Sequence, residues 1–173
     1  VLLALLLDQA SKLYIKTHFQ LGESREVFSW FWIVFVENNG MAFGIEWFSK
    51  LLLTLFRIVA VGVIGWYIHI MISKQEVRIG YLTTISMVMA GALGNIIDCV
   101  FYGKIWGYAG WFHGKVVDML YFPLIRNAAG ECLFFRPVFN IADSFITVAV
   151  VLVLIFYRKD LDNSLNQIFP KKA

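Results

Sequence analysis

Residues 51–73 read LLLTLFRIVAVGVIGWYIHIMIS, and residues 79–102 read IGYLTTISMVMAGALGNIIDCVFY. Each run reaches the roughly 20 apolar residues that an α-helix needs to cross about 30 Å of hydrocarbon. The charged segment KQEVR at 74–78 separates the runs and is short enough to be a tight turn between antiparallel helices. The chain is therefore predicted to be a membrane protein with these two runs as central helices.

The composition favours a bilayer over a large soluble core. Hydrophobic residues make up 60% of the 173 positions, charged residues 16%, and the mean hydropathy is +0.71. A soluble domain is about half apolar and about a quarter charged. The net charge of +3 is small and scattered, so no nucleic-acid partner is expected. The two cysteines, Cys99 and Cys132, match no metal-ligand spacing, and a disulfide between them is an open alternative.

Two further helices are predicted toward the ends of the chain. Residues 1–16 are largely apolar but too few to span, so we expect that apolar residues precede Val1. A secretory signal peptide is the alternative there, although no small-x-small cleavage site follows. The predicted fold class is an all-α membrane protein with a single domain over 1–173. Its four-transmembrane-helix bundle comprises about 1–16, 51–73, 79–102 and 139–157, with a small extramembrane β-rich element in outer segment 17–50 and a long outer loop in outer segment 103–138.

Basic residues set the predicted orientation, because cytoplasmic loops carry an excess of Lys and Arg. They are concentrated in the turn after the 51–73 helix and in the polar tail after the last helix. Both regions are therefore predicted to be cytoplasmic, which puts segments 17–50 and 103–138 outside. The residues concerned are Lys74, Arg78, Arg158, Lys159, Lys171 and Lys172.

The predicted topology gathers acids and amides at one depth. Asp98 lies 19 residues beyond Ile79, or about 28 Å along a helix, which is nearly the hydrocarbon thickness. The last helix runs inward from residue 139, so Asn140 and Asp143 lie in its first turns, and Asp118 precedes it in the outer segment. An ionisable residue at such a depth indicates a functional site near the outer interface.

Asp118 and Asp143 suit a site in which two carboxylates share one proton. Such a pair supplies an acid and a base together, because proximity of like charges raises one of the two pKa values. The alternative is structural: Asp143 caps the last helix and Asp118 is a solvated loop residue. The residues taken alone leave both interpretations open.

Other candidates are weaker. Asp8 and Lys12 are four residues apart on a helix, which predicts an ion pair. A Ser–Lys peptidase built on Ser11 and Lys12 is excluded, because adjacent helical residues do not face each other. Glu37 and Glu46 flank the Asn-Gly turn at 39–40 and are predicted to be solvated.

Five short motifs follow one another from the first predicted helix to the last. They are Asp8-Gln9-Ala10-Ser11-Lys12, Asn38-Asn39-Gly40-Met41-Ala42-Phe43, Gly94-Asn95-Ile96-Ile97-Asp98, Val116-Val117-Asp118 and Phe139-Asn140-Ile141-Ala142-Asp143-Ser144. In these motifs and in their order, the chain resembles the bacterial lipoprotein signal peptidases (signal peptidase II), small four-helix membrane aspartic peptidases. Each motif alone is weak, but the ordered set is specific.

The resemblance implies an enzyme of the bacterial inner membrane with its site near the outer face. The expected substrate is a diacylglyceryl-modified prolipoprotein, cut just before the lipidated cysteine. Membrane lipids and globomycin-type inhibitors are the other implied partners, and no cofactor or metal is implied. It implies that Asp118 and Asp143 are catalytic, that Asn38, Gly40, Asn95, Asp98, Asn140 and Ala142 shape the site or bind substrate, and that Asp8 and Lys12 support it.

The sequence departs from the family pattern in two places. Family members often carry arginine where this chain has Cys99, so a cationic contact is absent or comes from Lys104, Lys115 or Arg136. The outer segments at 101–114 and 126–136 look longer than in compact members. A lid over the two carboxylates is one expectation for them.

Three other functions compete with the peptidase. A proton-coupled transporter would place its acids near the midplane of repeated or broken helices, whereas these acids lie near one interface and no repeat is present. A presenilin-like protease would need a Gly-x-Gly-Asp motif and more crossings. In a non-catalytic assembly factor, the acids would be structural.

Overall fold

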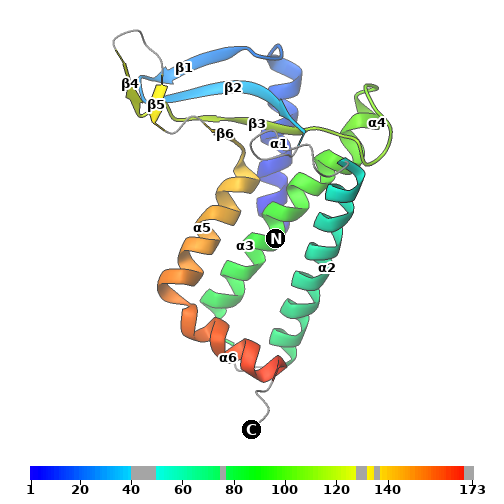
Figure 1. Ribbon diagram of the computed structural model, residues 1–173, viewed down its shortest axis with the longest axis vertical. Helices are drawn as coiled ribbons and strands as arrows, with labels where there is room; N and C mark the ends of the chain where they lie inside the picture. Colours follow the sequence, from blue (N-terminus) through cyan, green and yellow to red (C-terminus); the bar gives the residue numbers. More distant parts are fainter. Residues whose placement is uncertain (40–49, 75–76, 128–131, 135–136, 170–173) are drawn as a thin grey trace.

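The computed structural model describes residues 1–39, 50–74, 77–127, 132–134 and 137–169. Helices α1 (Leu2–His18), α2 (Lys50–Lys74), α3 (Ile79–Ile97) and α5 (Ile141–Phe156) form a bundle, as Figure 1 shows. Helix α3 contacts α1, α2 and α5. The helix bounds agree with the sequence prediction to within about two residues. The exception is the third helix, whose α-helical part ends at Ile97 instead of residue 102.

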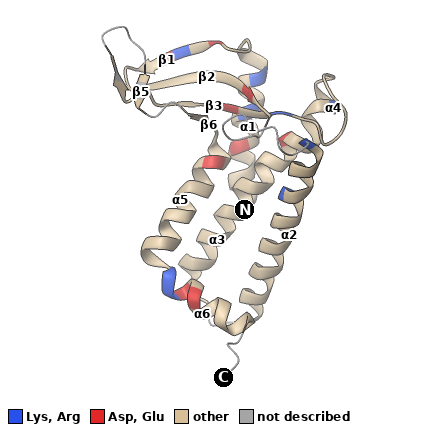
Figure 2. Cartoon of the chain, in the orientation of Figure 1, with Lys and Arg blue, Asp and Glu red and all other residues tan. Residues whose placement is uncertain are grey.

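The bundle has the dimensions of a membrane protein. Among the described residues, two helices are long and apolar enough to cross a bilayer, Lys50–Ser73 and Ile79–Ile105. Helix α5 together with α6 (Arg158–Ile168) gives a third candidate, bent by 89° between the two helices. Figure 2 shows charged residues gathered at the two ends of the bundle, with mostly uncharged helix between them. Four crossings, with α1 as one of them, stay a prediction.

Small residues on α3 allow its neighbours to approach closely, as the Gly/Ala-rich sequence predicted. A Cβ added at Gly94 would lie 2.5 Å from Oδ2 of Asp8 on α1 and 3.2 Å from Cβ of Ala142 on α5. A Cβ at Gly91 would meet the carbonyl oxygen of Ala142. Only glycine at these positions lets α1 and α5 bring their polar residues against α3.

The third helix does not continue as a regular α-helix to residue 102. Residues Asp98–Tyr102 form a π-helical turn (η2), followed by the short helix α4 (Gly103–Ile105). The amides of Phe112 and Gly114 donate to the carbonyls of Val100 and Cys99, at 3.1 and 2.8 Å. The loop after α4 thus folds back onto η2 and binds carbonyls of that turn. Hydrophobicity alone could not predict this change in helix type.

An antiparallel sheet of order β1-β2-β3-β6 lies across one end of the bundle (Figure 1). Its strands are β1 (Ser24–Phe28), β2 (Phe31–Asn38), β3 (Val116–Tyr121) and β6 (Val138–Phe139). The predicted β-rich element at 17–50 is confirmed for its described part. The prediction that 103–138 is one long loop is wrong for its described part, because this segment supplies β3 and the start of β6 to the same sheet, while its outer position stays a prediction. Strand β3 reads VVDMLY, a β-branched and apolar run that pairs with β2 on one side and β6 on the other.

The described parts of the two segments expected as a lid lie at opposite ends of the sheet, and a lid over the two carboxylates stays a prediction. The α4 region stands at one end of the sheet, and the hairpin of β4 (Ile125–Arg126) and β5 (Cys132–Phe134) stands at the other (Figure 1). The Cys99–Cys132 disulfide is not formed, since both thiols are free and Cys99 is buried in η2.

A hydrophobic cluster holds the sheet on the bundle. Ile15 and Phe19 at the end of α1 pack with Phe35 of β2, Val117 of β3 and Tyr102 of η2. Since Asp118 follows Val117 in β3, burial of Val117 in this cluster fixes Asp118 relative to α1 and α3.

The polar tail predicted after residue 157 is a helix in its described part. Helix α6 turns across the end of the bundle opposite the sheet (Figure 1). The hydroxyl of Tyr67 on α2 lies 2.5 Å from the hydroxyl of Tyr81 on α3 and also bonds that of Ser164 on α6. These bonds attach α6 to the two central helices.

Candidate active site

Asp118 is a buried carboxylate held by two amide side chains. It is 2% exposed, and Oδ2 accepts from Asn38 Nδ2 at 3.1 Å while Oδ1 accepts from Asn140 Nδ2 at 2.7 Å. Burial raises the pKa of Asp118 to about 6. The hydrogen bond from Asn38 opposes that rise, and the negative charge of Asp143 adds to it. Asp118 can therefore carry a proton near neutral pH.

Asn140 joins the two carboxylates that the sequence singled out. It caps α5, with Oδ1 accepting from the backbone amide of Asp143 at 2.9 Å, while its own amide donates to Asp143 Oδ2 at 3.3 Å. Its Nδ2 has two protons and donates one to Asp118 and one to Oδ1 of Asn95, the latter at 3.1 Å. One side chain thus fixes the start of α5 and brings Asp143 into the environment of Asp118.

Asn95 of α3 completes the arrangement from the other side. Its Nδ2 donates to Asp143 Oδ1 at 2.8 Å, and its Oδ1 accepts from Lys12 Nζ at 3.0 Å as well as from Asn140. Asp143 is therefore held by amide donors at both oxygens. The bond to Lys12 determines which way the Asn95 amide points, because an ammonium group can only donate.

Beneath these residues lies a buried ionic layer. Lys12 forms ion pairs with Asp8 at 2.8 Å and Asp98 at 2.9 Å, and all three side chains are at most 1% exposed. The predicted Asp8–Lys12 ion pair is confirmed. Asp8 Oδ1 accepts from the amide of Ala142 at 2.9 Å, and Asp98 Oδ2 accepts from the amide of Val117 at 3.2 Å. The layer therefore links α1, α3, α5 and β3 directly below the candidate carboxylates.

Gln9 belongs to this layer, and sequence reasoning gave it no role. Its Nε2 donates to Asp8, to Asp98 and to the carbonyl of Gly94, at 3.0–3.1 Å, and its Oε1 accepts from the Tyr102 hydroxyl at 3.2 Å. An amide within an apolar helix was the available signal, because it must find partners inside the protein.

An apolar pocket of about 570 Å³ opens beside Asp143. It lies between the sheet and the first turns of α5, next to the carboxylate network. Its walls are almost wholly hydrocarbon, so it suits an apolar group placed against a carboxylate. The lining residues are Leu120, Phe122, Pro137, Phe139, Asp143, Ser144, Thr147 and Val148.

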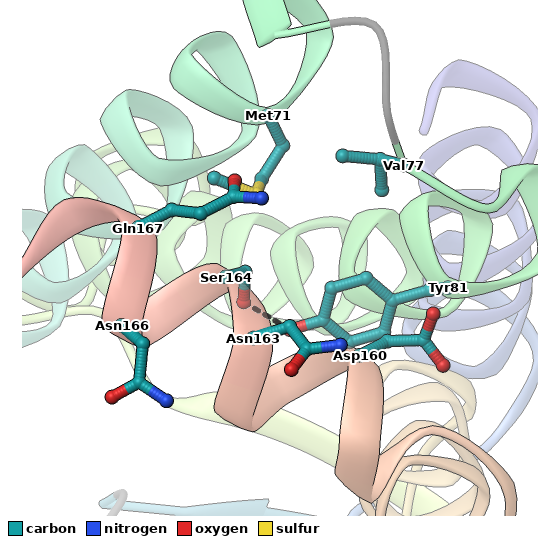
Figure 3. A pocket seen from close by; sticks show the side chains of 8 residues that line it. All are labelled: Met71, Val77, Tyr81, Asp160, Asn163, Ser164, Asn166 and Gln167. Carbon is teal, nitrogen blue, oxygen red and sulfur yellow. Dashed lines mark hydrogen bonds between the residues drawn. The ribbon is translucent and has the colours of Figure 1, made fainter.

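A second pocket, of about 310 Å³, lies at the α6 end (Figure 3). Tyr81, Asp160 and Ser164 line it, and the hydroxyls of Tyr81 and Ser164 are 3.5 Å apart. Figure 3 labels no residue of the carboxylate network, and this pocket lies at the end of the bundle opposite the sheet.

The structure brings together most residues that the sequence selected. Asp8, Lys12, Asn38, Asn95, Asp98, Asp118, Asn140, Ala142 and Asp143 form one hydrogen-bonded set. Gly40 and Glu46 lie outside the described residues. The prediction that Glu37 is solvated is wrong: its side chain is 11% exposed and forms ion pairs with two lysines.

A cationic group lies next to Cys99, where family members often carry arginine, but it comes from none of the three residues that the sequence suggested. Nη1 of Arg57, on α2, lies 3.1 Å from Sγ of Cys99. Lys115 instead pairs with a carboxylate of β2, Lys104 is exposed, and Arg136 lies outside the described residues. A guanidinium group therefore reaches position 99 from the neighbouring helix.

Within the part of the chain that the structure describes, no group of at least three His, Cys, Asp or Glu side chains has the arrangement of a metal site. The carboxylate oxygens of Asp118 and Asp143 accept from amide groups.

Comparison with known proteins identifies the family. Residues 1–158 match the family model described as Signal peptidase (SPase) II. The chain belongs to the signal peptidase II family. As a signal peptidase II, it is a membrane enzyme of the aspartic type.

Relatives of this signal peptidase II match over nearly the whole chain. The lipoprotein signal peptidase of Porphyromonas gingivalis is 44% identical over 92% of this chain and 81% of its own length. That of Amoebophilus asiaticus is 35% identical over 92% of this chain and 76% of its own length. A bacterial membrane enzyme solved by the in meso method at 2.3 Å resolution superposes with a TM-score of 0.69. It is 28% identical and covers 99% of this chain and 90% of its own. Neither the family nor these relatives favour the transporter alternative.

Proposed function

We propose that this signal peptidase II removes signal peptides from diacylglyceryl-modified prolipoproteins, cutting just before the lipidated cysteine, with Asp118 and Asp143 as its catalytic pair. The observation that carries the proposal is the position of Asn140, which donates to Asp118 while capping the helix that begins with Asp143. If Asp143 only capped α5 and Asp118 were only a loop residue, the side chain of Asn140 would not need to bind both of them. The structural alternative accounts for Asp143, which belongs to the capping box of α5, but not for Asp118, which is buried and bound by two amides instead of solvated.

The unequal environments of the two carboxylates suggest their roles. Asp118, whose pKa burial raises to about 6, carries the proton, and it polarises the scissile carbonyl by donating to the oxygen. Asp143, partly exposed and lining the apolar pocket, acts as the base. It takes a proton from water as the water oxygen adds to the carbonyl carbon. Collapse of the tetrahedral intermediate breaks the C–N bond, and the same proton passes to the leaving nitrogen.

The remaining residues of the network bind or position. Asn38 and Asn140 hold Asp118, and Asn95 holds Asp143. Asp8, Lys12, Asp98 and Ala142 fix the helices beneath them and contribute shape and support. Gly40, which belongs to the family motif, is proposed as a site-shaping residue on the resemblance alone.

A substrate with acyl chains reaches this site from the membrane. The pocket beside Asp143 has apolar walls and continues down α5 as far as Val148, so hydrocarbon can enter it from the bilayer. We propose four crossings in the bacterial inner membrane, with the sheet on the outer face and α6 on the cytoplasmic side. Membrane lipid is then a neighbour of the site, and globomycin-type cyclic peptides are expected to block it.

The substrate assignment is tested with purified enzyme in detergent. A precursor peptide carrying diacylglyceryl on its cysteine is compared with the same peptide unlipidated, each with and without globomycin. We expect cleavage of the lipidated peptide only, at the bond before the cysteine, and loss of that cleavage with globomycin. Equal rates on the two peptides would show that lipid is not recognised and would overturn the substrate assignment.

A further inference from the structure

Glu37 is the centre of an ion-pair cluster next to the candidate site. Its Oε1 lies 2.5 Å from Nζ of Lys16 on α1, and its Oε2 lies 3.1 Å from Nζ of Lys115, the residue before β3. The side chains of Lys16 and Glu37 are only 6% and 11% exposed. Although burial opposes it, hydrogen bonds from the two lysines lower the pKa of Glu37, so it is ionised.

Lys16 is fixed by aromatic rings as well as by Glu37. Its Nζ lies 5.1 Å from the ring centre of Trp106, 5.3 Å from Tyr108, 5.5 Å from Phe35 and 5.9 Å from Tyr102. Ring faces attract a cation most strongly when water is excluded. Lys16 is thus a buried anchor on α1, and its ammonium group binds the Glu37 carboxylate.

The pairing of β2 with β3 connects the position of Glu37 to that of Asp118. In β2, Glu37 is followed by Asn38, and the register pairs Glu37 with Val117 and Asn38 with Val116 of β3. Successive side chains of a strand point to opposite faces. Glu37 therefore holds the end of β2 from one face, while Asn38 donates to Asp118 on the other.

We infer that Glu37 is a positioning residue for cleavage: anchored by Lys16 and Lys115, it holds the last residue of β2 so that the Asn38 amide stays on Asp118. The inference rests on the proposed function, because Asp118 must be catalytic for this placement to affect rate. Glu37 itself does not contact Asp118 in the hydrogen bonds of the described residues. Lys115 gives Glu37 a second route to Asp118, along β3, and a double-mutant cycle with Asn38 separates the two routes.

The test is a double-mutant cycle on cleavage of the lipidated precursor. The variants are Glu37→Gln, Asn38→Ala and both together, with Glu23→Gln as the control. Glu23 forms an ion pair with Arg25 at the same sheet. Among the described contacts, the Glu23 side chain makes no hydrogen bond to β3. We expect Glu37→Gln to lower kcat about ten- to a hundred-fold with KM nearly unchanged, as for loss of a hydrogen bond to a charged group.

The double variant decides the inference. If Glu37 acts through Asn38, the double variant is no slower than Asn38→Ala by more than about three-fold, because contacting residues are non-additive. The inference would be overturned if the kcat losses of the two single variants multiplied in the double variant. It would also be overturned if Glu37→Gln changed only KM, or if Glu37→Gln cleaved the precursor like the wild type. If Glu37→Gln does not fold, Glu37→Asp replaces it in the cycle, since the shorter side chain keeps the buried charge but not the reach to both lysines. An inactive wild type under the same conditions refutes the proposed function instead.

Discussion

At the scale of single residues, the site depends on amide side chains that each bind one acid and at least one further group. Asn140 caps α5 and binds Asp118, and Asn95 binds Asp143 while accepting from Lys12. Each amide has two donors and a carbonyl oxygen, so it can hold two groups at set distances without adding charge. A pair of carboxylates close together needs this neutral support, because further negative charge would oppose ionisation of both.

The raised pKa of Asp118 predicts the pH dependence of cleavage. The mechanism needs its proton, which is lost as the pH rises through about 6, so kcat/KM should decline above that pH. Burial, the largest cause, and the charge of Asp143 raise this pKa, while Asn38, Asn140 and Lys12 lower it. Removing the Asn38 bond in Asn38→Ala should therefore raise the pKa of Asp118 and shift the decline to higher pH.

The measurement is a pH profile of kcat/KM for the wild type and Asn38→Ala, with Asn163→Ala as control. Asn163 is exposed on α6 at the far end of the bundle. A decline that stays in place or shifts to lower pH in Asn38→Ala would contradict the assigned role of Asp118.

The sequence selected the acids and amides of the site, but not what surrounds them. Helix lengths and directions placed Asp98, Asp118 and Asp143 at one depth, and the family motifs supplied their roles. Glu37 was misjudged because its lysine partners are 21 and 78 positions away along the chain. No local pattern reports a contact that depends on the pairing of β2 with β3.

At the scale of elements, close packing on α3 brings α1 and α5 into register. Asp8 cannot move away from Gly94, because its oxygens are bound by Lys12 and by the amide of Ala142. The small residues of α3 are therefore as necessary to the site as its acids. Small residues let helix backbones approach closely in a membrane, and here the approach brings a buried ion pair with it.

Gly94→Ala should accordingly damage both stability and cleavage. The added Cβ would lie 2.5 Å from Asp8 Oδ2, and overpacking of this kind costs about 1–3 kcal/mol. We expect a lower melting temperature in detergent and a large loss of kcat. The matched control is Gly62→Ala on α2, which meets nothing within 4 Å and should melt no lower than the wild type. Identical melting of Gly94→Ala and the wild type would mean that α1 and α3 are not packed as described.

Helices were easier to predict than strands for a physical reason. The central helices are continuous apolar runs, so their bounds follow from composition, and α2 extends just one residue beyond the expected range at each end. The strands β3 and β6 are short and become stable only by pairing, β3 with β2 and β6 with β3. The outer loop was therefore expected where the structure has a sheet, and the π-helical turn was unforeseen.

At the scale of the whole molecule, polar groups mark two ends of an apolar bundle. The sheet, the carboxylate network and the Lys16–Glu37 pair lie at one end, and α6 lies at the other (Figures 1 and 2). The positions of the Lys and Arg residues in the sequence predicted that segments 17–50 and 103–138 lie at the end opposite the polar tail. The sequence could not predict that residues after the last apolar helix form α6, because their attachment depends on hydroxyl contacts with Tyr67 and Tyr81.

The orientation is tested by cysteine labelling from one side of the membrane. In a Cys132→Ser background, Ser24→Cys on β1 and Asp162→Cys on α6 each provide one exposed thiol, since Cys99 is buried. An impermeant maleimide added to spheroplasts should label Ser24→Cys at once and Asp162→Cys only after lysis. The reverse order of labelling would invert the proposed topology.

The central claim is that Asp118 and Asp143 act together on the scissile bond. The most direct measurement is the rate of lipidated-precursor cleavage by Asp118→Asn and Asp143→Asn, beside the exposed control Asp162→Asn. Each amide keeps the shape of the side chain but removes its proton exchange, so both variants should fold and lose about a thousand-fold or more in kcat, while Asp162→Asn matches the wild type. A folded Asp118→Asn or Asp143→Asn within about ten-fold of the wild-type rate would contradict the account, because loss of an essential general acid or base costs about a hundred-fold or more.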